Sequence, residues 1–186
     1  MAAVARLQPE LNTPRLRLRE FRADDAGGLY AVHSDPRVMR YWSYPAWTRM
    51  EQAQAKVADT LGQRARGDVH VWAVADRDSD CLIGSIAAFN LDRAQARAEI
   101  GYSLAAEWHG RGLAQESLRA VLAFLFGDLQ LERIEADVDP RNAPSCRLLE
   151  RLGFVREGVL RQRWRVAGEV SDSAIYGLLA PEFVRA

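Results

Sequence analysis

The sequence predicts an α/β fold in which one mixed sheet carries helices on both faces. Several segments alternate apolar with polar residues, which is typical of strands with one buried face. Between two of them, residues 113–126 repeat apolar side chains at helical spacing and need a sheet to cover. With 186 residues, 48% of them hydrophobic, the chain is long enough to bury the core of one domain. We expect an N-terminal tail over residues 1–12 and a single domain over residues 13–186.

The first elements follow from local patterns. Residues 16–21 alternate apolar and polar side chains and predict an opening strand. The acidic pair at 24–25 suits the start of a helix that carries His33 on its apolar face. A loop rich in aromatic residues follows at 41–47.

A second helix and a hairpin come next. Thr48 is a candidate N-cap, and Glu51, three residues later, completes a capping box for a helix that runs to about Gly67. Residues 69–75 and 82–90 are rich in β-branched and apolar side chains on either side of a turn rich in aspartate. This pattern predicts a β-hairpin.

The centre of the chain reads strand, glycine loop, helix, strand. Residues 97–104 form the first strand and 133–138 the second, which the crossover rule makes parallel to the first. The amphipathic helix at 113–126 connects them. A helix at 142–152 and two strands complete the mixed sheet, at 154–160 and 173–179.

Composition argues against several classes of protein. The 25 basic and 25 acidic residues cancel, which disfavours a nucleic-acid partner held by bulk charge. No apolar run is long enough to cross a membrane, and the N-terminus lacks the apolar core of a signal peptide. Cys81 and Cys146 show neither metal-ligand spacing nor a disulfide framework. We therefore expect a cytoplasmic protein with reduced thiols, no metal and no membrane partner.

The loop between the strand at 97–104 and the helix at 113–126 carries the strongest functional signal. It reads His109-Gly-Arg-Gly-Leu-Ala114. Gly110 and Gly112 have no Cβ, so consecutive backbone N–H groups can turn toward one point. Because that point is also a helix N-terminus, it attracts a phosphate.

A second segment follows about thirty residues later and reads Asn142-Ala-Pro-Ser145, then Leu148 to Phe154. Together the two segments resemble the acyl-CoA-binding core of the GNAT superfamily of N-acyltransferases. Gly112 and Ala114 match the pyrophosphate loop of that superfamily, whereas His109 stands where a glutamine or arginine is usual. The resemblance extends over about residues 13 to 180.

This resemblance implies a GNAT fold, in which the sheet is mostly antiparallel and the central parallel strands splay apart. It implies that acetyl-CoA is the co-substrate, with its pantetheine arm bonded to exposed backbone between these strands. The cofactor-binding residues that it implies are Ser103, Leu104, His109, Gly110, Arg111, Gly112, Leu113, Ala114, Asn142, Ser145 and Arg147.

Acyl transfer also needs groups that move protons. Glu99 is the candidate base, acting directly or through a water, because it shares a strand face with Ser103; a solvated or ion-paired carboxylate is the alternative. An α-amino acceptor, with a pKa of about 7.7–8.0, would need less help than a lysine. The resemblance makes Ser145 the candidate acid for the thiolate, and a hydroxyl that bonds only backbone or cofactor is the alternative. Tyr102 and Tyr176 rank lower because their alternation predicts core positions.

The acceptor side rests on aromatic residues that resemble the cleft lining of the superfamily. The substrate-binding candidates are Tyr41, Trp42, Tyr44, Trp47 and Trp164, with His70 a weaker one. Half of the loop aromatics can equally pin the loop to the core. Residues 160–165 are rich in arginine and lack the glutamate that other members of the branch carry there, which favours an acidic acceptor.

The leading hypothesis is therefore an acetyl-CoA-dependent N-acetyltransferase that resembles the ribosomal-protein N-terminal acetyltransferase branch. It acts by direct attack of an amine in a ternary complex, and the acceptor is a protein N-terminus or a small-molecule amine. The alternative is a non-catalytic acyl-CoA-binding sensor. A nucleotide-binding Rossmann fold is disfavoured because the glycines follow a late strand. A homodimer is expected by analogy alone.

Overall fold

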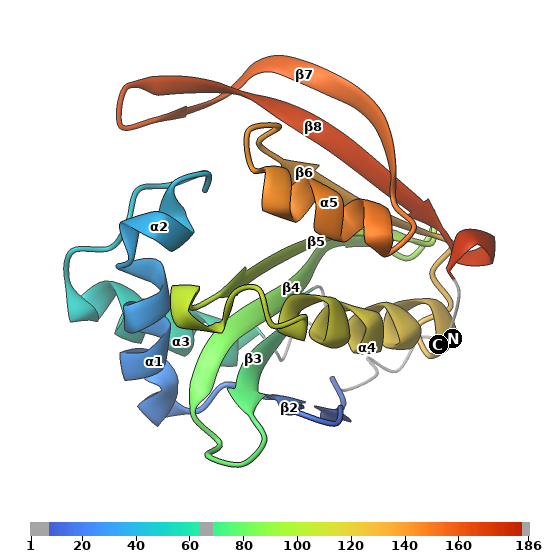
Figure 1. Ribbon diagram of the computed structural model, residues 1–186. Coiled ribbons are helices and arrows are strands. Elements are labelled where there is room, and N and C mark those ends of the chain that lie inside the picture. Colours follow the sequence, from blue (N-terminus) through green and yellow to red (C-terminus); the bar gives the residue numbers. More distant parts are fainter. Residues whose placement is uncertain (1–7, 64–68, 184–186) are drawn as a thin grey trace.

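The computed structural model describes residues 8–63 and 69–183, and within them one mixed sheet of eight strands forms the centre of the molecule (Figure 1). The strands in chain order are β1 (Leu11–Asn12), β2 (Leu16–Arg19), β3 (His70–Asp76), β4 (Leu82–Asp92), β5 (Arg97–Leu104), β6 (Arg133–Val138), β7 (Val155–Val166) and β8 (Glu169–Leu179). Their order across the sheet is β1-β2-β3-β4-β5-β6-β8-β7. Among these strands only β5 and β6 pair in parallel, as predicted.

Helices cover both faces of the sheet. They are α1 (Ala26–His33), α2 (Pro36–Met39), α3 (Met50–Gln63), α4 (Leu113–Gly127) and α5 (Ala143–Arg151). Strand β3 shows the division between the faces. Trp72 and Val74 pack in the cluster that contains α4 and α5, whereas Ala73 packs with α1 and α3. We call these two surfaces of the sheet the α4 face and the α1 face.

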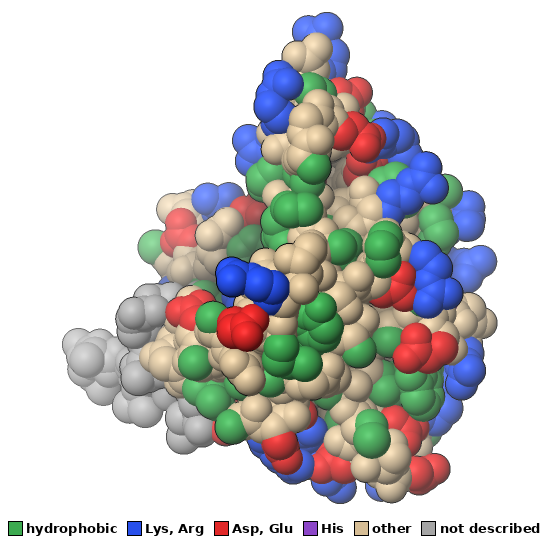
Figure 2. All heavy atoms as spheres, turned by 90° about the vertical axis from the view of Figure 1, so that its left-hand side faces the viewer, with side chains coloured by type: hydrophobic (Ala, Val, Ile, Leu, Met, Phe, Trp, Pro, Cys, Tyr) green, Lys and Arg blue, Asp and Glu red, His purple; other side chains and the backbone are tan. Residues whose placement is uncertain are grey.

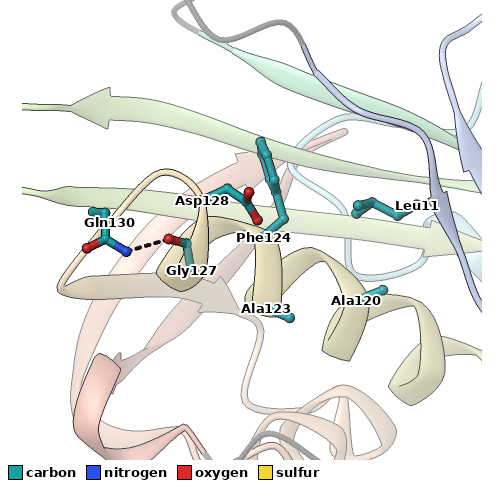
Figure 3. A pocket seen from close by; sticks show the side chains of 7 residues that line it. All are labelled: Leu11, Ala120, Ala123, Phe124, Gly127, Asp128 and Gln130. Atoms are coloured by element: carbon teal, nitrogen blue, oxygen red, sulfur yellow. Dashed lines mark hydrogen bonds between the residues drawn. The ribbon is translucent and has the colours of Figure 1, made fainter.

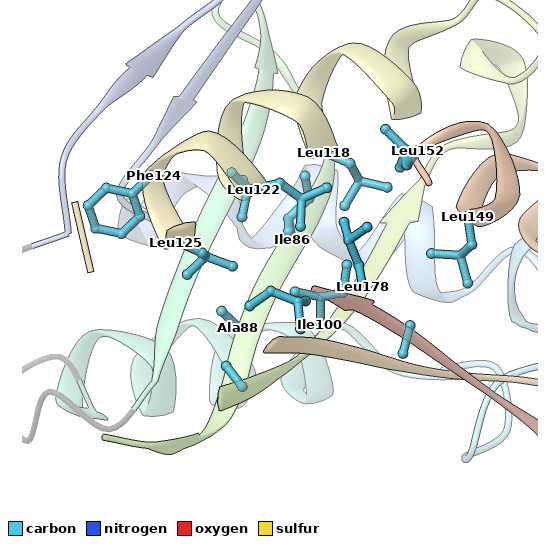
Figure 4. Close-up of a cluster of buried hydrophobic side chains, with 14 of the residues drawn as sticks. Ile86, Ala88, Ile100, Leu118, Leu122, Phe124, Leu125, Leu149, Leu152 and Leu178 are labelled. Carbon is cyan, nitrogen blue, oxygen red and sulfur yellow. The ribbon is translucent and has the colours of Figure 1, made fainter. Parts of the chain in front are cut away.

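The larger core lies between α4 and the sheet (Figure 4). Leu118 and Leu122 of α4 are fully buried and pack with Ile100 of β5 and Leu178 of β8. The helical spacing predicted this apolar stripe, and its burial fixes the axis of α4 along the sheet. The start of α4 is thereby placed beside the ends of β5 and β6.

Two strands are longer than predicted. Strand β7 continues to Val166 and β8 begins at Glu169, with a turn at residues 167–168 between them. The prediction ended the first of them at about residue 160 because the arginine-rich stretch that follows has no apolar face. It needs none, because this hairpin extends beyond the core and the side chains of 155–165 are exposed.

The starts of two helices differ from the sequence prediction. The capping interaction of α3 comes from Gln52 rather than Glu51, because its Oε1 accepts hydrogen bonds from the amides of Thr48 (2.9 Å) and Arg49 (3.1 Å). Helix α3 therefore begins at Met50, one residue later than predicted. The expected end of this helix near residue 67 lies outside the described residues. Helix α2 was not predicted, and the Asp35 side chain caps it.

Residues 8–12 were assigned to a tail, yet they lie against the sheet. The Gln8 side-chain amide donates to the carbonyl of Val71 and accepts from its N–H, both at 2.8 Å. The Trp72 indole donates to the Pro9 carbonyl at 2.9 Å, and Leu11 pairs with Leu18. The first part of the expected tail, residues 1–7, lies outside the described residues.

Candidate active site

The glycine loop joins the end of β5 to the start of α4. Gly110 and Gly112 adopt φ values of +73° and +77°, a left-handed conformation that residues with a Cβ rarely adopt. Gly112 is the N-cap of α4. Within the described chain, no protein acceptor is recorded for the backbone amides of residues 110–114. The loop therefore leaves a row of free donors at the positive end of the α4 dipole.

Three residues that sequence reasoning missed hold this loop in place. Glu116, in the first turn of α4, accepts hydrogen bonds from the Thr13 hydroxyl (2.6 Å) and from the Arg15 amide (3.0 Å) and Nε (2.8 Å). Arg15 also donates from Nη1 to the carbonyl of Arg111 at 2.9 Å. The segment before β2 thus clamps the loop, and no local pattern in the sequence indicates a contact between positions so far apart.

His109 and Arg111 were expected to contact the cofactor, but in the structure their side chains contact residues of the same loop region. The His109 ring is hydrogen-bonded through Nε2 to the carbonyl of Leu104 at 2.8 Å, and its backbone amide donates to Ala106. His109 therefore holds the loop to the end of β5. The Arg111 guanidinium lies over the Trp108 ring at 5.0 Å.

The parallel strands β5 and β6 separate after a short stretch of pairing. Residues 97–99 pair with 133–135, and the register goes no further, although β5 continues to Leu104 and β6 to Val138. The backbone edges of residues 100–104 and 136–138 therefore face each other without being paired. The expected splay of the central strands is confirmed, and its open end points toward the glycine loop.

On the α4 face, two hydroxyl groups meet beside this gap. Tyr102 Oη lies 2.6 Å from Ser145 Oγ. Asn142 is the N-cap of α5, and its Oδ1 accepts a hydrogen bond from the Ser145 amide at 3.3 Å, which fixes the position of Ser145. Burial raises the pKa of Tyr102 to about 12, so its phenol stays protonated at neutral pH. Alternation had ranked Tyr102 as a core residue, but its hydroxyl lies at the candidate acid.

Carboxylates gather on the α1 face of the same two strands. Glu99 lies opposite Glu135 at the last paired position, and its Oε1 accepts a hydrogen bond from Asn90 Nδ2 at 2.9 Å. Glu135 is neutralised by Arg133 at 2.7 Å. Asp137 follows one strand repeat later, where β6 no longer pairs with β5, and it accepts a hydrogen bond from the Ser173 hydroxyl. Sequence reasoning did not single out Asp137, because alternation predicts only a polar position there.

The aromatic loop is anchored on His33, which also was not predicted as a site residue. The buried His33 ring is hydrogen-bonded through Nδ1 to Tyr44 Oη at 2.9 Å and through Nε2 to Ser103 Oγ at 3.3 Å. It stacks on Trp47 at 4.6 Å and meets the edge of Trp42 at 5.1 Å. Tyr44 and Trp47 therefore pin the loop to the sheet, as half of the aromatic residues were expected to do.

The other part of the loop lines a hollow of about 220 Å³ between α2, the loop and the turn end of the β7–β8 hairpin. Figure 2 views the molecule from the side of α2, and the hairpin end rises above the rest of the surface with basic side chains over it. The hollow is lined by Pro36, Met39, Arg40, Tyr41, Trp42, Pro45, Ala46, Asp139, Arg141, Val166, Ala167, Glu169 and Ser171.

One arginine crosses this hollow. Arg141 pairs with Asp139 at 2.6 Å and with Glu169 at 2.5 Å, and its guanidinium lies 5.7 Å from the centre of the Tyr41 ring. It joins the end of β6 to the start of β8. The lining of the hollow is therefore aromatic and apolar, with its charged groups largely paired.

The three remaining candidates, Trp164, Arg147 and His70, lie in different surroundings. Trp164 lies on β7 near Asp137, where its indole opposes the rise in the pKa of that carboxyl. Arg147 is exposed on α5. His70 is buried against Trp72 and Phe124 in the main core, and this position removes it from the acceptor side.

A larger hollow, of about 530 Å³, lies on the outer side of α4 (Figure 3). Its walls are mainly Ala120, Ala123 and Gly127 together with Leu11, and Gln130 donates to the Gly127 carbonyl beside them. It begins about two turns beyond the glycine loop, and Phe124 and Asp128 complete its lining. It takes no part in the chemistry described below.

Among residues 8–63 and 69–183, no group of three or more His, Cys, Asp or Glu side chains is arranged to hold a metal ion. No helix in these ranges is long and apolar enough to cross a membrane.

Comparisons with known proteins agree with this geometry. Residues 15–155 match the family described as acetyltransferase (GNAT) domain. The uncharacterised N-acetyltransferase YoaA of Bacillus subtilis is 37% identical over 175 residues, which cover 93% of this chain and 98% of that protein. The ribosomal protein uS5-alanine N-acetyltransferase of Escherichia coli is 28% identical over 184 residues, covering 93% of this chain and 92% of that protein.

A solved structure shares the fold. The microcin C7 self-immunity acetyltransferase, determined in complex with acetyl-CoA and AMP, superimposes with a TM-score of 0.80 at 20% identity, covering 90% of this chain and 93% of that chain. The sequence match and these relatives lead to one conclusion: the chain is an acyltransferase that belongs to the GNAT family of acetyltransferases.

Proposed function

We propose that this protein transfers the acetyl group of acetyl-CoA to a primary amine. The observation that carries the proposal is the row of backbone amides at residues 110–114 at the N-terminus of α4, which have no acceptor among the protein residues that the structure describes. Such a row suits the diphosphate of coenzyme A. The microcin relative, which shares this fold, was determined with acetyl-CoA bound.

The gap between β5 and β6 begins at the same end of the sheet. Residues 100–104 pair with β4 and residues 136–138 with β8, but the edges that face the gap are unpaired. These edges offer amide donors and carbonyl acceptors to an extended chain, much as an added β-strand is bound. In our proposal the pantetheine arm lies along these edges, with Ser103 and Leu104 contributing backbone groups. The thioester then lies between the two faces of the sheet.

Proton transfer in this proposal uses groups on opposite faces. The Tyr102–Ser145 pair on the α4 face protonates the departing thiolate, and its short separation supports a shared proton. A carboxylate on the α1 face takes the proton of the amine. In the part of the chain that the structure describes, Glu99 and Asp137 flank the start of the gap without an arginine at hydrogen-bond distance.

The acceptor enters from the α1 face in this proposal. The hollow beside Tyr41 and Trp42 is lined on its other side by Asp139 and Ser171, and its aromatic walls suit an extended or apolar amine. The relative from E. coli acts on an alanine of ribosomal protein uS5 by its name. An α-amino group of a protein N-terminus is therefore the first acceptor to test, followed by small-molecule amines.

The test is a turnover screen of the purified protein with acetyl-CoA. Free thiol is measured with peptides bearing different N-terminal residues, with polyamines and with aminoglycosides, and mass spectrometry locates the added acetyl group. We expect thiol release with at least one class of amine. Acetyl-CoA binding without thiol release from any amine would contradict the proposal and favour the acyl-CoA sensor.

A further inference from the structure

Asp137 occupies a special position on β6. It is the first residue on the α1 face after β6 stops pairing with β5, so it borders the open part of the gap rather than its closed end. Its Oδ1 accepts a hydrogen bond from the buried Ser173 hydroxyl of β8. The side chain is 23% exposed, which leaves the carboxylate accessible from one side.

The charged and polar groups around Asp137 come from every neighbouring strand. Burial raises the pKa of Asp137, and the negative charge of Glu99 on β5 raises it further. On β7, Arg163 Nε lies 3.9 Å from Oδ2 and the Trp164 indole is nearby, and both lower the pKa. Since the net direction is upward, this carboxylate holds a proton more readily than an ordinary aspartate.

The hollow beside Tyr41 and Trp42 lies near this residue. Asp139 and Ser171 line the hollow. Ser171 lies two residues before Ser173 on β8, and Asp139 lies two residues after Asp137, just beyond the end of β6 at Val138. Side chains two residues apart on a strand point to the same face about 7 Å apart. Asp137 and Ser173 are therefore close to the residues that line the hollow, although neither is part of the lining.

The opposite side of the gap carries the Tyr102–Ser145 pair, on the α4 face. A reacting carbon placed in the gap would have the carboxylate of Asp137 on one side and the two hydroxyl groups on the other. This arrangement suits acyl transfer, which needs a base for the attacking amine and an acid for the departing thiolate.

We propose that Asp137, and not Glu99, is the base that accepts the proton of the attacking amine. The inference rests on the proposed acetyl transfer. The amine nitrogen forms a bond to the thioester carbon and passes one proton to the Asp137 carboxylate. The carbon–sulfur bond breaks, and its electron pair stays on sulfur, which takes a proton from the Tyr102–Ser145 pair. Solvent then removes the proton from Asp137 and restores the hydroxyl.

Glu99 has a different role in this scheme. It lies at the closed end of the gap, opposite Glu135, and the Asn90 amide occupies one of its oxygens. Its charge strengthens Asp137 as a base by disfavouring a second negative charge nearby. Glu99 is therefore a positioning residue that acts through Asp137.

The pH dependence of kcat distinguishes the roles of Asp137 and Glu99. It is measured at saturating acetyl-CoA with an amine found in the screen. Asp137→Asn should lower kcat by about 10²–10⁴-fold, with the dissociation constant of acetyl-CoA unchanged in calorimetry. Glu99→Gln should keep most of the activity and move the acidic limb of the profile to lower pH. Ser173→Ala should move it to higher pH, because the carboxylate loses a donor. Asp78→Asn, in the exposed β3–β4 turn, is the matched control.

Each result has a definite meaning. If Asp137→Asn keeps the wild-type kcat and profile, or if Glu99→Gln abolishes turnover while Asp137→Asn does not, Asp137 is not the base. Should Asp137→Asn fold poorly in circular dichroism, the opposite shifts of Glu99→Gln and Ser173→Ala still decide, and shifts in the same direction would overturn the inference. Failure of the proposed function looks different, because the wild-type protein itself would then release no thiol.

Discussion

The buried imidazole of His33 gives a sharp test of how the aromatic loop is held to the sheet. Burial lowers the pKa of His33 from 6.5 to about 4. In the unfolded chain, the imidazole takes up a proton near its ordinary pKa of about 6.5. Below that pH the unfolded state binds more protons than the folded state. The free energy of unfolding is therefore fully retained above about pH 6.5 and falls as the pH decreases toward 4.

The size of this effect follows from the two pKa values. A difference between 6.5 and about 4 corresponds to about 3 kcal/mol over the whole window. About 2 kcal/mol of it is lost between pH 7 and pH 5. That loss is a sizeable part of the total stability of an ordinary domain, about 5–15 kcal/mol.

Urea unfolding at pH 7 and pH 5 measures this loss of unfolding free energy. Tryptophan fluorescence is the signal because Trp42 and Trp47 contact the His33 ring. His33→Asn should show a smaller loss of unfolding free energy between the two pH values than the wild-type protein, by about 2 kcal/mol. Tyr44→Phe is the matched control, since it removes one hydrogen bond to the ring but keeps the titrating group. Equal losses in wild type and His33→Asn would refute the assignment of a neutral buried His33.

Three further predictions concern the loop and the hydroxyl pair. Ala114→Glu should weaken acetyl-CoA binding about tenfold or more in calorimetry, because the new carboxylate repels the diphosphate. Ala120→Glu, on the same helix beside the hollow of Figure 3, is the control and should leave the affinity unchanged. Equal affinities of the two variants for acetyl-CoA would remove the loop from the cofactor site. Ser145→Ala and Tyr102→Phe should each lower kcat about 10²-fold, and the double variant little more, because the pair acts as a unit; additive losses would contradict this. Glu116→Gln should lower the free energy of unfolding by about 1–2 kcal/mol in urea, and an unchanged value would show that its contacts with Thr13 and Arg15 are weak.

Much of the fold could be predicted from the sequence because its strands and helices are locally consistent. Strands β5 and β6 coincide with the predicted ranges, and α4 extends one residue further. The extension of β7 beyond residue 160 escaped prediction because exposed arginines leave no apolar alternation to recognise. Helix α2, only four residues long, depends on the Asp35 cap and is too short for a periodic signal.

The sequence by itself determined the glycine loop to which we assign the diphosphate, because its glycines and the start of α4 lie within a few residues and their geometry is local. Only the tertiary structure decided which groups meet at the candidate site. Tyr102 and Ser145 are 43 residues apart, Asp137 and Ser173 are 36 apart, and His33 and Ser103 are 70 apart. These pairs form because the register and the parallel crossover of the strands bring them together. No spacing within a single segment records such a contact.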